Sequence, residues 1–161
     1  MNYEQLLNYV SEEFSVYEVP LIEQTGSYGF FSNGTILIEE TQSEIEKKCI
    51  LAEEYGHGIK NVGNILDQQV TENRKQELVA RRYAHELLVP LIELVRAKKF
   101  GCNSLFETAE YLEVTEDFLI EALEQYKVQY ADGIIVSNHQ IYFEPFLEIT
   151  SLKDQSNQKK P

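Results

Sequence analysis

Apolar residues recur at intervals of three and four along most of the chain, a spacing that favours amphipathic helices packed against one another. This spacing predicts helices over residues 3–14, 44–57, 73–89, 90–99, 104–112 and 115–126. Ser43 and Glu46 fit a capping box at the start of the second helix, and we expect Gly58 to end it. Pro90 has no backbone N–H, so the third helix should end just before it.

Strand-like segments precede and follow the helical stretch. They cover residues 16–20, 29–31, 36–38, 134–136 and 141–143. Asn33 and Gly34 favour the positive φ angles of a tight turn, which predicts a β-hairpin around them. Together these patterns predict an α+β fold, mainly α, in a single domain of residues 1–150. The polar residues 151–161 are expected to form a disordered tail.

Charge and cysteine content exclude several classes of protein. With 14 Lys and Arg against 27 Asp and Glu in 161 residues, the net charge of −13 repels nucleic-acid phosphates and anionic membranes. Cys49 and Cys102 are too few for a disulfide framework, and no basic and apolar leader opens the chain. Apolar runs stay below the ~20 residues that cross a bilayer. We therefore expect a cytoplasmic protein without direct nucleic-acid or membrane binding.

The positions of Glu53, His57 and Glu77 in the sequence indicate a metal site. Glu53 and His57 are four apart, so they share one helix face, inside the apolar arc. Either this arc is only partly covered, or a cation neutralises the carboxylate there. Glu77 is the natural third ligand, because it shares a stripe of the next long helix with apolar positions. This set leaves a fourth position for water, as in catalytic zinc sites, and Glu54 borders that position. The same Glu–His spacing is, however, also common on solvated helices.

Two segments resemble a known family. Residues 51–57 read Leu-Ala-Glu-Glu-Tyr-Gly-His, and residues 77–90 read Glu-Leu-Val-Ala-Arg-Arg-Tyr-Ala-His-Glu-Leu-Leu-Val-Pro. They are similar to the patterns L-A-H-E-x-G-H and E-x-x-A-x-x-F-A-x-x-L-L-x-P of the ImmA/IrrE metallopeptidases. The resemblance implies a zincin-like minimal metalloprotease core at residues 1–89, followed by a helical part with a C-terminal hairpin at 90–150.

The resemblance also implies roles for individual residues. His57 and Glu77 would be ligands of Zn²⁺, or of another divalent metal such as Mn²⁺, and Glu54 would be the general base. The implied activity is that of a metallo-endopeptidase that makes one specific cut in a helix-turn-helix repressor of a phage or integrative element. By the same comparison, Glu53 stands where the family has its first histidine.

Glu53 changes the charge of the expected site. With two carboxylates and one imidazole, a Zn²⁺ site has zero net charge instead of +1, which lowers its Lewis acidity. This departure leaves a second function open, in which the protein is a catalytically silent anti-repressor that keeps the fold and binds the repressor. Its acidic surface would then compete with DNA for the basic face of that partner.

Other motifs point to packing more than to chemistry. Residues 85–89 resemble the zinc-binding pattern H-E-x-x-H, but the last position is Val89, which cannot bind a metal. His85 is therefore interpreted as structural. Residues 107–115 have the rhythm of a helix-turn-helix, which would suit a DNA-binding regulator. The helix that would read DNA begins Glu116-Asp117, which is acidic where DNA contact favours basic or amide side chains. We interpret this segment as a scaffold or a partner surface.

The roles of four more residues are considered from the sequence. Asp67 and Tyr83 are candidates to lie behind the ligands or to face substrate, against the alternatives of a solvated loop carboxylate and a core tyrosine. Cys49 and Cys102 have no Cys or His at ligand spacing, so both are expected to be small buried apolar residues.

Overall fold

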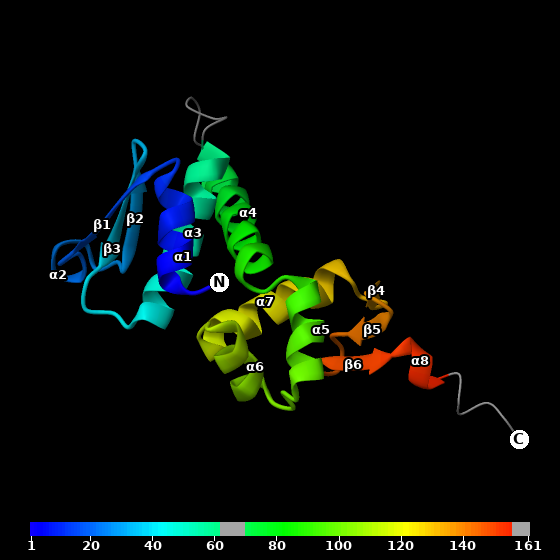
Figure 1. Cartoon of the computed structure of the whole chain (residues 1–161). Coiled ribbons are helices and arrows are strands. Elements are labelled where there is room, and N and C mark those ends of the chain that lie inside the picture. Colours follow the sequence, from blue (N-terminus) through cyan, green and yellow to red (C-terminus); the bar gives the residue numbers. More distant parts are fainter. Residues whose placement is uncertain (62–69, 156–161) are drawn as a thin grey trace, which may run out of the picture.

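The computed structural model describes residues 1–61 and 70–155, with the side chains of residues 1–60 and 74–153. Within these ranges the chain is mainly helical and has two three-stranded sheets, which confirms the predicted α+β class (Figure 1). The elements are α1 (Tyr3–Ser11), β1 (Ser15–Val19), α2 (Ile22–Thr25), β2 (Gly29–Ser32), β3 (Thr35–Glu39), α3 (Glu44–Asn61), α4 (Val70–Leu88), α5 (Leu91–Phe100), α6 (Leu105–Leu112), α7 (Glu116–Gln129), β4 (Ile134–Val136), β5 (His139–Tyr142), β6 (Glu148–Ser151) and α8 (Leu152–Gln155).

Side-chain caps begin several helices where the sequence places them. In the capping box of α3, Ser43 N donates to Glu46 Oε2 at 2.9 Å, and Glu46 N donates to Ser43 Oγ at 3.3 Å. The hydroxyls of Ser104 and Thr115 each accept the amide N–H three residues ahead, at 3.1 Å, at the starts of α6 and α7. These bonds satisfy amide donors that have no partner within the helix.

The first sheet has the order β1-β3-β2, with β1 parallel to β3 and β2 antiparallel to it. The predicted hairpin is present: Asn33 and Gly34 have φ values of 48° and 75°, as a type I′ turn requires. Ile36 and Ile38 are fully buried on the face that α1 and α3 cover (Figure 1). The sheet thus supports the helix that carries Glu53, Glu54 and His57.

Gly58 does not end α3, and that prediction was wrong. The helix continues to Asn61. A Cβ atom at Gly58 would lie 2.8 Å from the Phe14 ring and 3.0 Å from the Phe31 ring, so this glycine allows close packing rather than a stop. The next helix, α4, begins at Val70, before the predicted start at residue 73.

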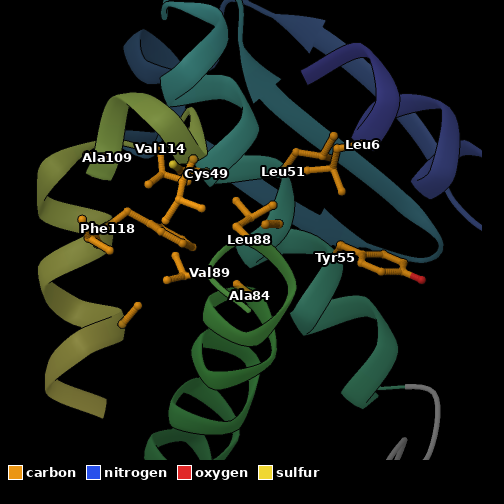
Figure 2. Packing of buried hydrophobic residues seen from close by; sticks show 14 of the residues in the cluster. Leu6, Cys49, Leu51, Tyr55, Ala84, Leu88, Val89, Ala109, Val114 and Phe118 are labelled. Atoms are coloured by element: carbon orange, nitrogen blue, oxygen red, sulfur yellow. The ribbon is translucent and has the colours of Figure 1, made fainter. Parts of the chain in front are cut away.

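One apolar cluster joins the two halves of the chain. Figure 2 shows Cys49 of α3 together with Leu88 of α4, Phe118 of α7 and Val114 between α6 and α7, all of them buried. Cys49 and Cys102 are buried free thiols, as expected. The helix with the candidate ligands is therefore held by the sheet on one side and by α4 on the other, and α7 packs on α4.

A buried lysine adds a polar link within this core. The Lys48 side chain is only 2% exposed, and its Nζ donates to the carbonyl oxygen of Leu112 at 2.8 Å. This bond satisfies a carbonyl at the C-terminus of α6, where a positive charge is favourable. It connects α3 directly to the α6–α7 pair.

The C-terminal half contains one strand more than predicted. The expected hairpin is β4 with β5, and β6 extends it to the order β4-β5-β6. Ile149 of β6 is buried opposite Ile141, which explains why this short segment joins the sheet. The expected tail at 151–161 therefore starts too early: Ser151 ends β6 and α8 follows, while residues 156–161 lie outside the described ranges.

Candidate metal centre

Helices α3 and α4 run antiparallel and approach each other at two small residues. A Cβ atom on Gly56 would lie 2.4 Å from the carbonyl oxygen of Ala80, so the two backbones are almost in contact there. Only glycine at position 56 allows this distance. The crossing places His57, the next residue of α3, opposite Glu77, which lies one turn before Ala80.

His57 and Glu77 form a direct pair. The Nε2 atom of His57 lies 3.2 Å from Oε2 of Glu77, with 27% and 45% of the two side chains exposed. The pair is therefore open to solvent on one side. Two ligands of a tetrahedral zinc ion with bonds of ~2.0–2.1 Å lie ~3.3 Å apart, so this spacing suits two positions of such an ion.

Glu53 lies in the same cluster of charges and is partly buried. Burial raises the pKa of Glu53, and the nearby guanidinium of Arg81 opposes this rise. The carboxylates of Glu121 and Glu77 push the pKa of Glu53 further up. The Glu53 side chain thus has one carboxylate neighbour on α4 and one on α7. Arg81 is the positively charged group near enough to lower its pKa.

Glu54 occupies a confined position beside the first sheet. Burial, followed by the charges of Glu53 and Glu77, raises the pKa of Glu54 to about 7. Gly29 of β2 forms the wall on one side, since a Cβ atom there would lie 2.6 Å from Glu54 Oε1. The glycine therefore leaves the space that the carboxyl group fills. Sequence reasoning missed Gly29, because its partner is 25 residues away.

Arg81 and Glu121 were also missed. Arg81 Nε lies 3.0 Å from Glu77 Oε1, and Arg81 Nη1 lies 3.6 Å from Glu121 Oε2 on α7. The spacing of four between Glu77 and Arg81 is a recognisable helix ion pair and could have been found. The approach of Glu121 could not, because it depends on how α7 packs on α4.

The chemistry of these side chains suits a divalent metal ion. Their donor types, an imidazole and carboxylates, fit a divalent ion, and the His57–Glu77 spacing fits two of its positions. No group of three His, Cys, Asp or Glu side chains converges as a metal cage within residues 1–60 and 74–153. The structure thus brings together two of the three predicted ligands, and Glu53 stands beside them within electrostatic reach.

Of the two further candidate residues, Tyr83 and Asp67, the structure describes only Tyr83. The Tyr83 ring packs edge-on against Tyr55 at 5.7 Å between centroids, and Lys60 Nζ lies 5.8 Å above it. These contacts place Tyr83 in an aromatic cluster at the α3–α4 contact. Asp67 lies outside the described residues.

His85 belongs to the core, as expected. Its side chain is in edge contact with Phe118 at 4.9 Å, and its Nδ1 is hydrogen-bonded to Gln125 Oε1 at 2.7 Å. Burial lowers the pKa of His85. A neutral ring held between α4 and α7 is a packing element.

An imidazole and carboxylates on two crossing helices are the donor types of metal-dependent hydrolases. The chain belongs to the peptidase M78 family, whose IrrE N-terminal-like domain matches residues 4–124. This is the ImmA/IrrE family that the two sequence segments resemble, and membership implies a divalent metal, usually zinc. The matched region includes Glu53, Glu54, His57 and Glu77. The searches of curated proteins and of solved structures found no match.

Across residues 1–61 and 70–155, no helix combines the length and the apolar character that a bilayer crossing requires.

Proposed function

We propose that this protein is a cytoplasmic metal-dependent endopeptidase that makes one specific cut in a helix-turn-helix repressor of a phage or mobile element. The observation that carries the catalytic part is the His57–Glu77 pair, 3.2 Å apart and open to solvent, with Glu54 confined beside it. Family membership supports the peptidase class. The repressor as substrate rests on the family resemblance alone.

His57, Glu77 and Glu53 would hold the metal, which is Zn²⁺ or another divalent ion such as Mn²⁺. When bound, this ion supplies a Lewis acid that polarises the scissile carbonyl. Glu54 accepts a proton from the attacking water and then passes it to the leaving amine. The space beside Gly29 that the Glu54 carboxyl group fills supports this role.

Glu53 tunes this site through its charge. A ligand set with two carboxylates neutralises Zn²⁺ completely, so the polarising power is lower than with a second histidine. Arg81, which is close to Glu53 and bound to Glu77, withdraws part of that negative charge. We therefore expect a slower peptidase than one with two histidine ligands.

The test combines elemental analysis with cleavage of a purified helix-turn-helix repressor of a phage or mobile element. Protein purified without chelator should contain about one divalent ion per chain, and the wild type should cut the repressor at one position. Glu54→Gln should reduce the rate on the order of 10²- to 10⁴-fold, because it removes the general base but keeps the side chain's size.

Glu44→Gln, on the exposed first turn of α3, is the matched control and should cut at the wild-type rate. EDTA should abolish cleavage, and added Zn²⁺ or Mn²⁺ should restore it. Repressor binding that survives EDTA and Glu54→Gln, with no cut under any condition, would instead indicate the silent anti-repressor.

A further inference from the structure

The C-terminal half contains a large apolar groove that the proposed peptidase site does not use. It lies among α5, α6, α7 and the second sheet, which sit together in the lower half of Figure 1, and has a volume of about 680 Å³. Leu94 and Phe143 form a buried floor, while Leu105, Ile120 and Phe146 line it with 39%, 42% and 67% of their surfaces exposed. Exposed apolar side chains gathered in one groove are typical of a binding surface.

Acidic residues outnumber basic ones around the groove. Residues 104–129, from the start of α6 to the end of α7, contain one basic residue, Lys127, whose Nζ lies 3.7 Å from Glu124 Oε2 and 2.8 Å from Glu144 Oε2. The same residues contain seven acidic ones: Glu107, Glu110, Glu113, Glu116, Asp117, Glu121 and Glu124. Glu124 and Glu148 line the groove itself. Lys98 is the one cation among the described lining residues, and its Nζ donates to Asn103 Oδ1 at 3.1 Å.

We infer that this groove binds an amphipathic segment of a partner protein, which presents large apolar side chains next to Lys or Arg. Apolar side chains would cover Leu105, Ile120 and Phe146, and the basic ones would meet Glu124 and Glu148 at the border. The same acidic border repels nucleic acid, anionic membranes and a second copy of this chain, which has a net charge of −13.

Helix α7 takes part in both the groove and the candidate metal centre. Ile120 and Glu124 line the groove, while Glu121, which lies between them in sequence, contacts Arg81 beside Glu77. A segment in the groove therefore lies along the helix that also borders the proposed site of cleavage. The DNA-reading helix of a repressor is amphipathic and basic, so it has the chemistry required; this choice of partner rests on the proposed function, whereas the binding chemistry does not.

Two phenylalanines provide a matched test. The probe is a short fluorescein-labelled peptide with Leu on one face of a helix and Lys on the other. Its binding is followed by fluorescence anisotropy. Phe146→Ser should weaken binding at least about tenfold, because the largest exposed side chain of the groove is lost. Phe106→Ser removes an exposed phenylalanine of α6 that does not line the groove, and affinity should stay within about twofold. Equal affinities of the two variants would overturn the inference.

A charge-matched pair separates the groove from the net charge of the protein. Glu124→Gln with Glu148→Gln should reduce peptide affinity, whereas Glu4→Gln with Glu12→Gln on the exposed surface of the N-terminal part should not. A peptide with Ala in place of Leu should bind weakly. Equal loss in both double variants, or equal binding of both peptides, would contradict the inference, as would Phe146-dependent binding to phosphatidylglycerol vesicles or duplex DNA.

The same measurements distinguish failure of this inference from failure of the proposed function. Peptide binding should be unchanged in Glu54→Gln and in EDTA, because the groove residues are not candidate ligands. If no cleavage is ever detected but peptide binding depends on Phe146, the groove assignment stands and the peptidase assignment fails. If the repressor is cut and Phe146→Ser alters neither peptide binding nor cleavage, only the groove assignment fails.

Discussion

At the scale of single residues, the candidate site is a balance of charges around Arg81. Its guanidinium is bound to Glu77, approaches Glu121 and acts on Glu53, so one cation serves carboxylates from three helices. Close ion pairs of this kind hold carboxylates near one another that would otherwise repel. Glu53, which is expected to replace the family's first histidine, adds its negative charge to this cluster.

Replacing Glu53 with histidine should make the proposed enzyme faster. The change returns a net charge of +1 to a Zn²⁺ site with one glutamate and two histidines, which increases its Lewis acidity. We expect the rate of repressor cleavage to rise by about tenfold, measured as kcat/KM with saturating zinc. A Glu53→His protein that binds zinc as tightly as the wild type but cuts no faster would contradict this reasoning, and Glu53→Gln serves as the control that removes the ligand charge.

Gly29→Ala should displace Glu54 without unfolding the protein. The new Cβ atom would lie 2.6 Å from Glu54 Oε1 and 2.7 Å from Ile50 Cγ2, which are side-chain atoms that can move. Because the carboxyl group would leave its position, we expect kcat to fall on the order of 10²-fold with little change in the melting temperature. Ser32→Ala, at the exposed end of the same strand, should leave kcat unchanged. Unaltered kcat in Gly29→Ala would show that this wall has no role.

At the scale of elements, the α3–α4 crossing sets the distance between the two halves of the site. A methyl group on Gly56 would be 2.4 Å from a backbone oxygen of α4, so Gly56→Ala must push the helices apart. We expect the free energy of unfolding to drop by about 1 to 3 kcal/mol, as for other overpacked cores, measured by urea denaturation. Zinc affinity, measured by calorimetry, should fall as well.

Gly58→Ala is the comparison for that variant. Its Cβ would meet the rings of Phe14 and Phe31 rather than the α4 backbone. It should therefore lower stability but leave zinc affinity close to that of the wild type. The same loss of zinc affinity in both variants would mean that the effect comes from general destabilisation.

Much of the fold was predictable because its signals are local. The cap at Ser43 and the turn at Asn33-Gly34 each depend on a few neighbouring residues, and each has the predicted geometry. Gly58 was misjudged because its role depends on Phe14, which approaches from another element. Among the site residues, Glu77 could be placed opposite His57 from helical spacing, but the approach of Glu121 depends on long-range packing that no local pattern encodes.

At the scale of the whole molecule, one buried carboxylate should link stability to pH. Glu39, at the end of β3, accepts hydrogen bonds from the amides of Leu21 and Ile22, both at 2.7 Å, and from the hydroxyl of Thr41 at 2.9 Å. The Ile22 amide makes the largest contribution to lowering the pKa of Glu39, to about 2. The ionised form is therefore favoured in the folded protein.

A lowered carboxyl pKa stabilises the fold above the ordinary value of 4.5, and the effect is lost as the pH falls towards 2. We expect Glu39→Gln to melt well below the wild type at pH 7, and the difference to shrink between pH 4.5 and 2. Thermal unfolding followed by circular dichroism measures it, with the exposed Glu40→Gln as control. A difference that is constant over this range would contradict the assignment.

The bond between Lys48 and Leu112 has a mechanical consequence. Any sliding of α6 away from α3 must strip a buried ammonium group of its acceptor, at a cost of ~1–3 kcal/mol. The bond therefore opposes sliding of α6 along α3.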